Sequence, residues 1–182
     1  TFKPSPQYNL QTNCPTNETF LKKQGLTVVL IDLSDPLSAA QEEALKNEFI
    51  SLTKSKGKKD NQRLLKKGDK LVVYLSNGQE VPDEIFNMCN PGTESEMSLL
   101  NEQKTMVQAK WDNFSKNMIN KLVEQFIKKQ EINKSPIIEN IAYVRNKEFD
   151  RPEYIKNDEN KTNNFLIVSD MIQNSKIYNR YK

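Results

Sequence analysis

Residues 28–36 read Val28-Val29-Leu30-Ile31-Asp32-Leu33-Ser34-Asp35-Pro36. Aliphatic and β-branched side chains stop at a carboxylate, and a hydroxyl follows two positions later. A continuous apolar run is typical of a strand buried on both faces of a parallel sheet. In open α/β sheets, ligands bind beyond the carboxyl ends of the strands. This stretch therefore predicts a buried strand over residues 26–33 that delivers oxygen atoms to the rim of a sheet.

A second run far downstream has the same design and reads Phe165-Leu166-Ile167-Val168-Ser169-Asp170. Its strand can be a neighbour of the first if the crossover connections are right-handed. Ser135 stands at a predicted helix start that faces the same rim. We therefore expect Asp32, Ser34, Ser135 and Asp170 to converge on one point. Such a set of hard oxygen atoms suits Mg²⁺, Ca²⁺ or Mn²⁺, with waters completing the coordination shell.

The other elements follow from hydrophobic periodicity and from start and stop signals. Ser38 and Gln41 form a capping box at the start of a helix, and Asn77-Gly78 marks a tight turn. After the first strand, we predict a helix from Ser38, a strand over 70–76 and a short antiparallel edge strand over 84–88. A long helical pattern follows over 99–130, which a bend can interrupt. The last predicted elements are a helix from Ser135-Pro136, a loop over 146–163 and a strand over 164–168. Alternating strands and helices predict an α/β fold: a three-layer, doubly wound, mainly parallel sheet with helices on both faces.

Length and composition indicate one domain behind a leader. The chain has 182 residues, enough to bury a core without help from a metal or a disulfide. Residues 1–24 are rich in proline and polar side chains and show no periodicity, so we expect an extended N-terminal leader. Residues 25–182 then form the α/β domain. Because the chain begins with Thr1, we expect that a signal or an anchor preceded it.

Charge and residue usage exclude several functions. The formal charge of +3 comes from 27 basic and 24 acidic residues, a balance that does not indicate nucleic-acid binding. The basic run over 54–59 fits a solvated loop better than a binding patch. The sequence has no histidine, which removes most transition-metal sites and most general-base chemistry. It has no apolar stretch of about 18 residues, so it predicts no membrane span.

Two cysteines bear on where the protein resides. Cys14 and Cys89 fit no zinc or redox motif. They can pair if the protein is exported, or stay free thiols if it is not, and the sequence leaves both alternatives open. The leader and the start at Thr1 favour an exported or membrane-tethered location, periplasmic or extracellular, over the cytoplasm.

The residues at the strand ends resemble the metal-ion-dependent adhesion site of the von Willebrand factor A domain, the fold of integrin inserted domains. That site uses D-x-S-x-S after the first strand, a threonine loop of the type G-T-P-L-x-E-A-L, and an aspartate in a T-D-G turn. Asp32 and Ser34 match the first motif, Ser135 in Lys134-Ser135-Pro136-Ile137-Ile138-Glu139-Asn140-Ile141 matches the second, and Asp170 matches the third. A bacterial subgroup carries D-P-L, C-N-P-G and S-D-M, which occur here at 35–37, 89–92 and 169–171. The resemblance covers residues 26–175.

The resemblance implies a Rossmann-like fold and a binding module that docks a protein partner, whose identity is not readable, through a divalent cation. Three positions depart from the family pattern. Pro36 stands where the family has the last serine of the first motif, Ser135 replaces threonine, and Met171 replaces glycine. The chain also stops before the last strand and helix of the family, so these elements are missing from this piece or the domain is a shortened variant.

Three alternatives compete with the metal site. Asp32, Ser34, Asp35 and Ser135 can each cap a helix, because such side chains accept hydrogen bonds from free N–H groups. The domain can then be a metal-free scaffold of the same fold. An aspartate-dependent phosphatase is a third interpretation, but it needs a carboxylate where Ser34 stands. We therefore predict a non-catalytic protein.

Overall fold

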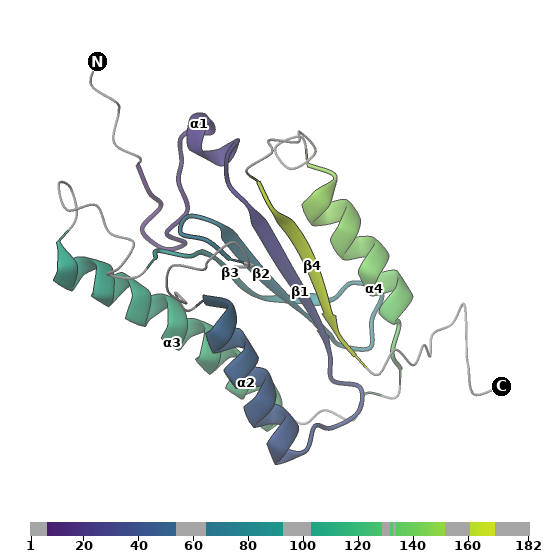
Figure 1. Ribbon diagram of the computed structural model, residues 1–182. Helices are drawn as coiled ribbons and strands as arrows, with labels where there is room; N and C mark the ends of the chain where they lie inside the picture. The colour runs from purple at the N-terminus through teal and green to yellow at the C-terminus, as the bar shows by residue number, and fades with distance from the viewer. Residues whose placement is uncertain are drawn as a thin grey trace.

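The computed structural model describes residues 7–53, 65–92, 103–128, 132, 134–151 and 161–169 (Figure 1). In chain order the elements are α1 (Glu18–Leu21), β1 (Leu26–Asp32), α2 (Ala39–Thr53), β2 (Lys70–Ser76), β3 (Asp83–Cys89), α3 (Lys104–Lys128), α4 (Ile137–Val144), the π-helix η2 (Arg145–Phe149) and β4 (Asn163–Val168).

The four strands form one open sheet in the order β3-β2-β1-β4. β1 runs parallel to β2 on one side and to β4 on the other, while β3 pairs antiparallel with β2 at the edge. The sheet is therefore mostly parallel, and the predicted α/β class is confirmed. The prediction that the first and last apolar runs are neighbouring strands is also confirmed.

Two apolar clusters cover the two faces of β1. Val29 and Ile31 point to one face, where they pack with side chains of α2 and α3. Leu26, Val28 and Leu30 point to the other face, where they pack with α4. Figure 1 shows α2 and α3 on one side of the sheet and α4 on the other. Every residue of β1 is buried, as expected for a strand with both faces covered.

Most predicted elements occur within a few residues of their predicted bounds. Ser38 and Gln41 form the predicted capping box: the Ser38 N–H donates to Gln41 Oε1 at 2.9 Å, and the Gln41 N–H donates to Ser38 Oγ at 3.4 Å. α3 is one continuous helix. The prediction of a loop from residue 146 is wrong at its start, because α4 continues into η2. The basic run over 54–59 lies outside the described residues.

The segment before β1 is attached by a disulfide to the edge strand β3, at the end of the sheet where β1 begins. Cys14 bonds to Cys89, the last residue of β3, across 75 positions of sequence. The Cys89 N–H donates to the carbonyl oxygen of Thr12 at 2.8 Å. The short helix α1 then leads into β1. Residues 7–24, predicted as an extended leader, thus contain a turn and a helix, while the boundary of the domain at residue 25 stays a prediction.

A buried carboxylate joins the starts of β1 and β2. Asp69 accepts the Gly25 N–H at 2.9 Å through Oδ1 and the Lys66 N–H at 2.8 Å through Oδ2. Burial raises the pKa of Asp69, although both N–H groups act to lower it.

The turn that follows β2 is fixed by a side-chain hydrogen bond, since Asn77 Oδ1 accepts the Gln79 N–H at 3.0 Å. Gly78 has a φ of 77° there, a backbone conformation that favours glycine.

A second buried carboxylate, Glu148 of η2, lies against side chains of β2. Its side chain is fully buried, and its Oε1 accepts the Tyr74 hydroxyl at 2.6 Å. Lys70 Nζ lies 3.8 Å from Oε2. Burial raises the pKa of Tyr74, and the hydrogen bond to Glu148 raises it further. Burial acts to raise the pKa of the nearby Glu84, but hydrogen bonds from Asn87 and Lys147 outweigh it and lower that pKa.

Candidate functional site

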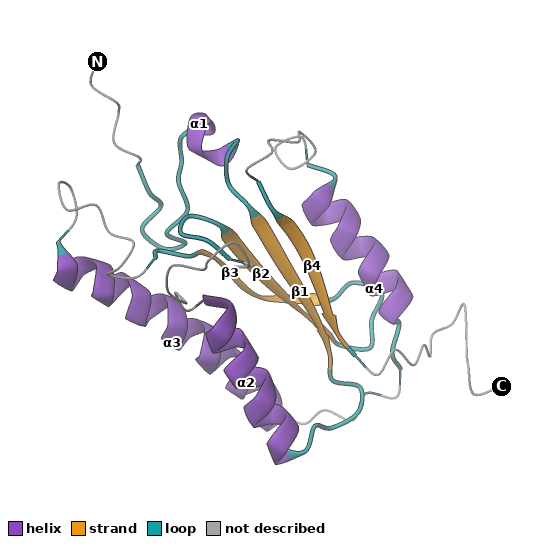
Figure 2. Cartoon of the chain, viewed as in Figure 1, coloured by secondary structure: helices purple, strands orange, loops and turns teal. Residues whose placement is uncertain are grey.

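The topology defines where a ligand crevice belongs. The chain reaches β2 from β1 through α2 on one face of the sheet, and it reaches β4 after α4 on the opposite face. Neighbouring strands whose connections leave on opposite faces create a switch point, and ligands bind beyond the carboxyl ends of the strands there. That position is the end of β1 and β4. Figure 2 shows that β1 and β4 end at the same end of the sheet.

Asp32 is the centre of a cluster of oxygen atoms at this position. It is the last residue of β1 and is 7% exposed. Its Oδ2 accepts a short hydrogen bond from the Oγ of Ser135, which is 4% exposed. The Oγ of Ser169, directly after β4, lies 3.4 Å from the same Oδ2. Residues separated by more than 100 positions of sequence therefore meet at one carboxylate.

The loop after β1 closes on the other oxygen of Asp32. The Ser34 N–H donates to Asp32 Oδ1 at 3.0 Å, so the carboxylate fixes its own loop. α2 begins only at Ala39, and Ser38 caps it. Ser38 therefore takes the cap position of α2, where the capping alternative had placed Asp32, Ser34 or Asp35.

Ser135 does not cap α4 either, contrary to the prediction that it would cap a helix on any account. α4 begins at Ile137, its N-cap residue is Pro136, and no side chain caps it. Ser135 lies one residue too early, and its hydroxyl donates to Asp32 instead. The sequence Ser135-Pro136 thus predicted the position of the helix correctly, but it did not indicate that Ser135 bonds to Asp32.

Of the four residues predicted for the site, the structure brings together Asp32, Ser34 and Ser135. Ser34 approaches Asp32 through its backbone N–H. Asp170 lies outside the described residues, and its neighbour Ser169 is the last described residue after β4.

Ser76 is a further member that sequence reasoning missed. It ends β2 and is the register partner of Asp32, so both side chains point to the face that α4 covers. Its side chain is fully buried, and its Oγ has no hydrogen-bond partner among the described residues. The sequence carries a signal for Ser76, because this serine follows the apolar run of β2 just as Asp32 follows the apolar run of β1. An orphaned hydroxyl beside a carboxylate fits a polar ligand at the rim.

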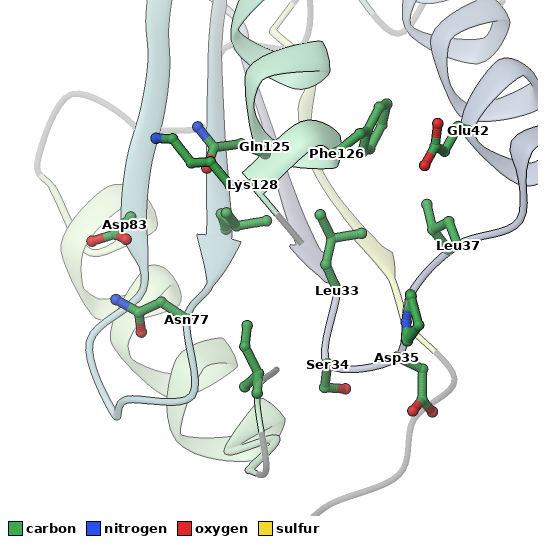
Figure 3. A pocket seen from close by; sticks show the side chains of 13 residues that line it. Leu33, Ser34, Asp35, Leu37, Glu42, Asn77, Asp83, Gln125, Phe126 and Lys128 are labelled. Atoms are coloured by element: carbon green, nitrogen blue, oxygen red, sulfur yellow. The ribbon is translucent and has the colours of Figure 1, made fainter. Parts of the chain in front are cut away.

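A cavity of about 580 Å³ lies on the opposite side of the loop after β1. Figure 3 shows Leu33 and Leu37 of the loop beside Phe126 of α3, with Ser34 and Asp35 at the outer bend of the loop. The Lys128 and Asp83 side chains lie at another wall of this cavity. The loop that carries the predicted ligands therefore has free space beside it.

The cluster combines one carboxylate with several hydroxyls. No group of three or more Cys, Asp or Glu side chains able to hold a metal occurs among the residues that the structure describes. A site of this composition would hold a hard cation through hydroxyl oxygens and water rather than through a cage of carboxylates.

Among the residues that the structure describes, no helix has both the length and the apolar character needed to cross a membrane.

Comparison with known proteins adds no identification. No protein-family model, no curated protein and no solved structure matches this chain.

Proposed function

We propose that this chain is a non-catalytic binding module of the von Willebrand factor A type, which docks a protein partner through a divalent cation at the carboxyl end of β1. In this proposal the sheet belongs to the three-layer, doubly wound arrangement of that family. The observation that carries the proposal is the convergence of Ser135 and Ser169 on Asp32, at the switch point of the sheet. Those positions belong to the second and third motifs of the resemblance.

The residues present fit a small hard cation. Octahedral Mg²⁺ has ligands at about 2.1 Å, which places neighbouring oxygen atoms about 3 Å apart. The 3.4 Å between Ser169 Oγ and Asp32 Oδ2 is close to that spacing. Asp32, Ser135 and Ser34 would hold the ion together with Asp170, and the orphaned Ser76 hydroxyl can bind a water of its shell. Pro36 supplies no side-chain oxygen, so an additional water takes that place.

The cation would supply an electrophilic position for an oxygen of the partner. With one or two carboxylates nearby, the ion keeps a net positive charge and attracts an acidic side chain. Asp32 and Ser135 hold their positions because both are buried, and the Ser34 N–H fixes the carboxylate. The Cys14–Cys89 disulfide supports an exported location for such a module, because disulfides persist in oxidising compartments.

Isothermal titration calorimetry with Mg²⁺, Ca²⁺ and Mn²⁺ tests the proposal. We expect at least one of the ions to bind with a dissociation constant of roughly 10⁻⁴–10⁻³ M, as in other sites with few charged ligands. Asp32→Asn keeps the shape of the side chain and removes its charge, so it should weaken binding at least about tenfold. Ser135→Ala removes one hydroxyl and should weaken binding less.

Glu43→Gln is the matched control, since Glu43 is 64% exposed on α2 and does not touch the cluster. It should bind the ions like the unaltered chain. Circular dichroism of each variant checks that the fold is kept, and Ser135→Ala carries the test if Asp32→Asn does not fold. Absence of heat with all three ions, or full affinity in both site variants, would reject the cation-dependent function.

A metal-free scaffold is the second candidate. The observation that favours it is that both Asp32 oxygens already accept hydrogen bonds from the protein. In that case Asp32 serves to tie α4 to the sheet, and its replacement lowers stability without any effect on ions. The same calorimetry, combined with thermal unfolding of Asp32→Asn, separates the two candidates.

A further inference from the structure

The turn between β2 and β3 begins with Asn77-Gly78, and Asn77 is the one asparagine of the sequence that a glycine follows. Such a pair is chemically labile, because the main-chain nitrogen after an asparagine can attack the side-chain amide and glycine has no side chain to obstruct the attack. The attack closes a five-membered ring within one chain, so its rate depends on how the two groups are oriented. The geometry of this turn therefore decides whether the pair reacts.

A hydrogen bond folds the Asn77 side chain back over the peptide group of Gly78. The Gln79 N–H donates to Asn77 Oδ1 at 3.0 Å. Oδ1 reaches an N–H two residues ahead only when the side chain lies along the intervening main chain, as in an Asx-turn. That arrangement brings Cγ of Asn77 beside the nitrogen of Gly78. The hydrogen bond therefore keeps the two reacting atoms near one another in the folded chain.

The same hydrogen bond stabilises the charge that the attack creates. When the nitrogen adds to Cγ, an electron pair of the amide carbonyl moves to Oδ1, and an N–H already directed at that oxygen stabilises the resulting oxyanion. The Asn77 side chain is half-buried and lines the cavity of about 580 Å³ beside the loop after β1. Figure 3 shows it at a wall of this cavity. Water can therefore reach the amide group.

We propose that Asn77 is a site of self-modification, at which the folded chain converts a side-chain amide into a carboxylate. The Gly78 nitrogen forms a bond to Cγ, and its proton passes through water to Nδ2. The bond between Cγ and Nδ2 then breaks, ammonia leaves, and a succinimide remains. Water opens this ring at either carbonyl carbon and leaves an aspartate or an isoaspartate. The reaction consumes only water, and it does not need the cation of the proposed function.

Either product changes the turn at the carboxyl end of β2. Both add a negative charge to the cavity wall, and isoaspartate also lengthens the main chain by one methylene carbon. The turn has little room for a longer chain, because a Cβ on Gly78 would lie 2.8 Å from Cγ2 of Ile132. Asn140 Nδ2 also donates to the Gln79 carbonyl oxygen at 2.7 Å across this turn. We therefore expect the isoaspartate form to unfold at a lower temperature than the unmodified chain.

Peptide mapping by mass spectrometry tests the proposal on the full folded chain, incubated with its disulfide intact at physiological temperature and pH for several weeks. Fragmentation of the peptides locates each asparagine that has become acidic. Asn113 and Asn117 are internal controls, since both are exposed on α3 and are followed by phenylalanine and methionine. We expect Asn77 to lose its amide at least about tenfold faster than either control.

A free peptide and a variant separate the effect of the fold from that of the motif. A synthetic peptide of residues 73–82 carries the same pair without the folded turn, so the folded chain should react at least as fast as the peptide. Asn77→Gln keeps an amide but has to close a larger ring, so its residue 77 should stay unchanged over the same time. An isoaspartyl methyltransferase, which labels only the isomerised product, should label the aged unaltered chain more strongly than the aged variant.

Three results would overturn the proposal. Loss of the amide at Asn77 no faster than at Asn113 and Asn117 would show that the pair is inert in the folded chain. A slower reaction in the folded chain than in the free peptide would show that the turn protects the pair. Equal labelling of the aged Asn77→Gln variant and the aged unaltered chain would place the isoaspartate elsewhere.

Discussion

We expect Glu148→Ala to lower the free energy of unfolding by about 3–5 kcal/mol, the range measured when one partner of a buried ion pair is removed. Glu148 is fully buried, and its Oε1 accepts the Tyr74 hydroxyl at 2.6 Å. Lys70, whose side chain is 13% exposed, lies 3.8 Å from its Oε2. The variant leaves a cavity, a buried hydroxyl that has lost an acceptor, and a mostly buried ammonium without this carboxylate.

Urea unfolding followed by circular dichroism measures this effect. Glu84→Ala is the matched control, since Glu84 also approaches the Tyr74 hydroxyl, at 3.1 Å, but its side chain is 32% exposed. Solvent screens such a group, so its removal should cost no more than about 1 kcal/mol. Tyr74→Phe should cost about 1.5–3 kcal/mol, because it removes a hydrogen bond to a charged group. Equal losses at Glu148 and Glu84 would contradict the importance assigned to burial.

The second large effect concerns the disulfide. We expect the double variant Cys14→Ser/Cys89→Ser to lose about 2–5 kcal/mol of stability, the usual range for a native disulfide. The bond closes a long loop across 75 positions, and without it the unfolded chain gains conformational freedom. In the folded state of the variant the segment over 7–24 keeps contacts such as the hydrogen bond from Gln24 Nε2 to the Gly68 carbonyl oxygen and the bond from the N–H of residue 89 to the Thr12 carbonyl oxygen.

Thermal unfolding with and without a reductant checks the disulfide prediction. Reduction should lower the midpoint of the unaltered protein to that of the double variant and should leave the variant itself unchanged. Limited proteolysis should then cut before β1 first, because the attachment of this segment is weakened. An unaltered midpoint after reduction would show that the bond contributes nothing to stability.

Most of the fold was predictable because each strand carries its own signal. β1 and β2 are continuous apolar runs, which only burial on both faces explains, and Asn77-Gly78 fixed the antiparallel turn to β3. The extension of α4 into η2 was not predictable, since residues 145–149 are mostly charged. Glu148 is buried there only because Tyr74 and Lys70 of β2 meet it from distant positions of the sequence. Pattern reasoning does not detect a pairing of this kind.

The candidate site was predicted in part for a similar reason. Asp32 was found because it ends a strand and Ser135 because it precedes a helix, and the fold brings them together. The interpretation of Ser135 as a helix cap failed because α4 begins one residue later than a Ser135 cap requires, so Pro136 takes the N-cap position. Ser76 was missed, although β2 carries it to the same rim as Asp32. Hydrophobic patterns show where each strand ends. Only the register of neighbouring strands decides which of these end residues point to the same face of the sheet.

A crystal structure of the protein grown with Mn²⁺, with data collected at the manganese absorption edge, would show whether a cation occupies the rim. We expect one strong anomalous peak at the carboxyl end of β1, within coordination distance of oxygen atoms from Asp32 or Ser135 or of waters that they hold. Asp32→Asn crystals grown in the same way should lose that peak. Anomalous density absent from the rim, with Ser135 still hydrogen-bonded to Asp32, would contradict cation binding at this site.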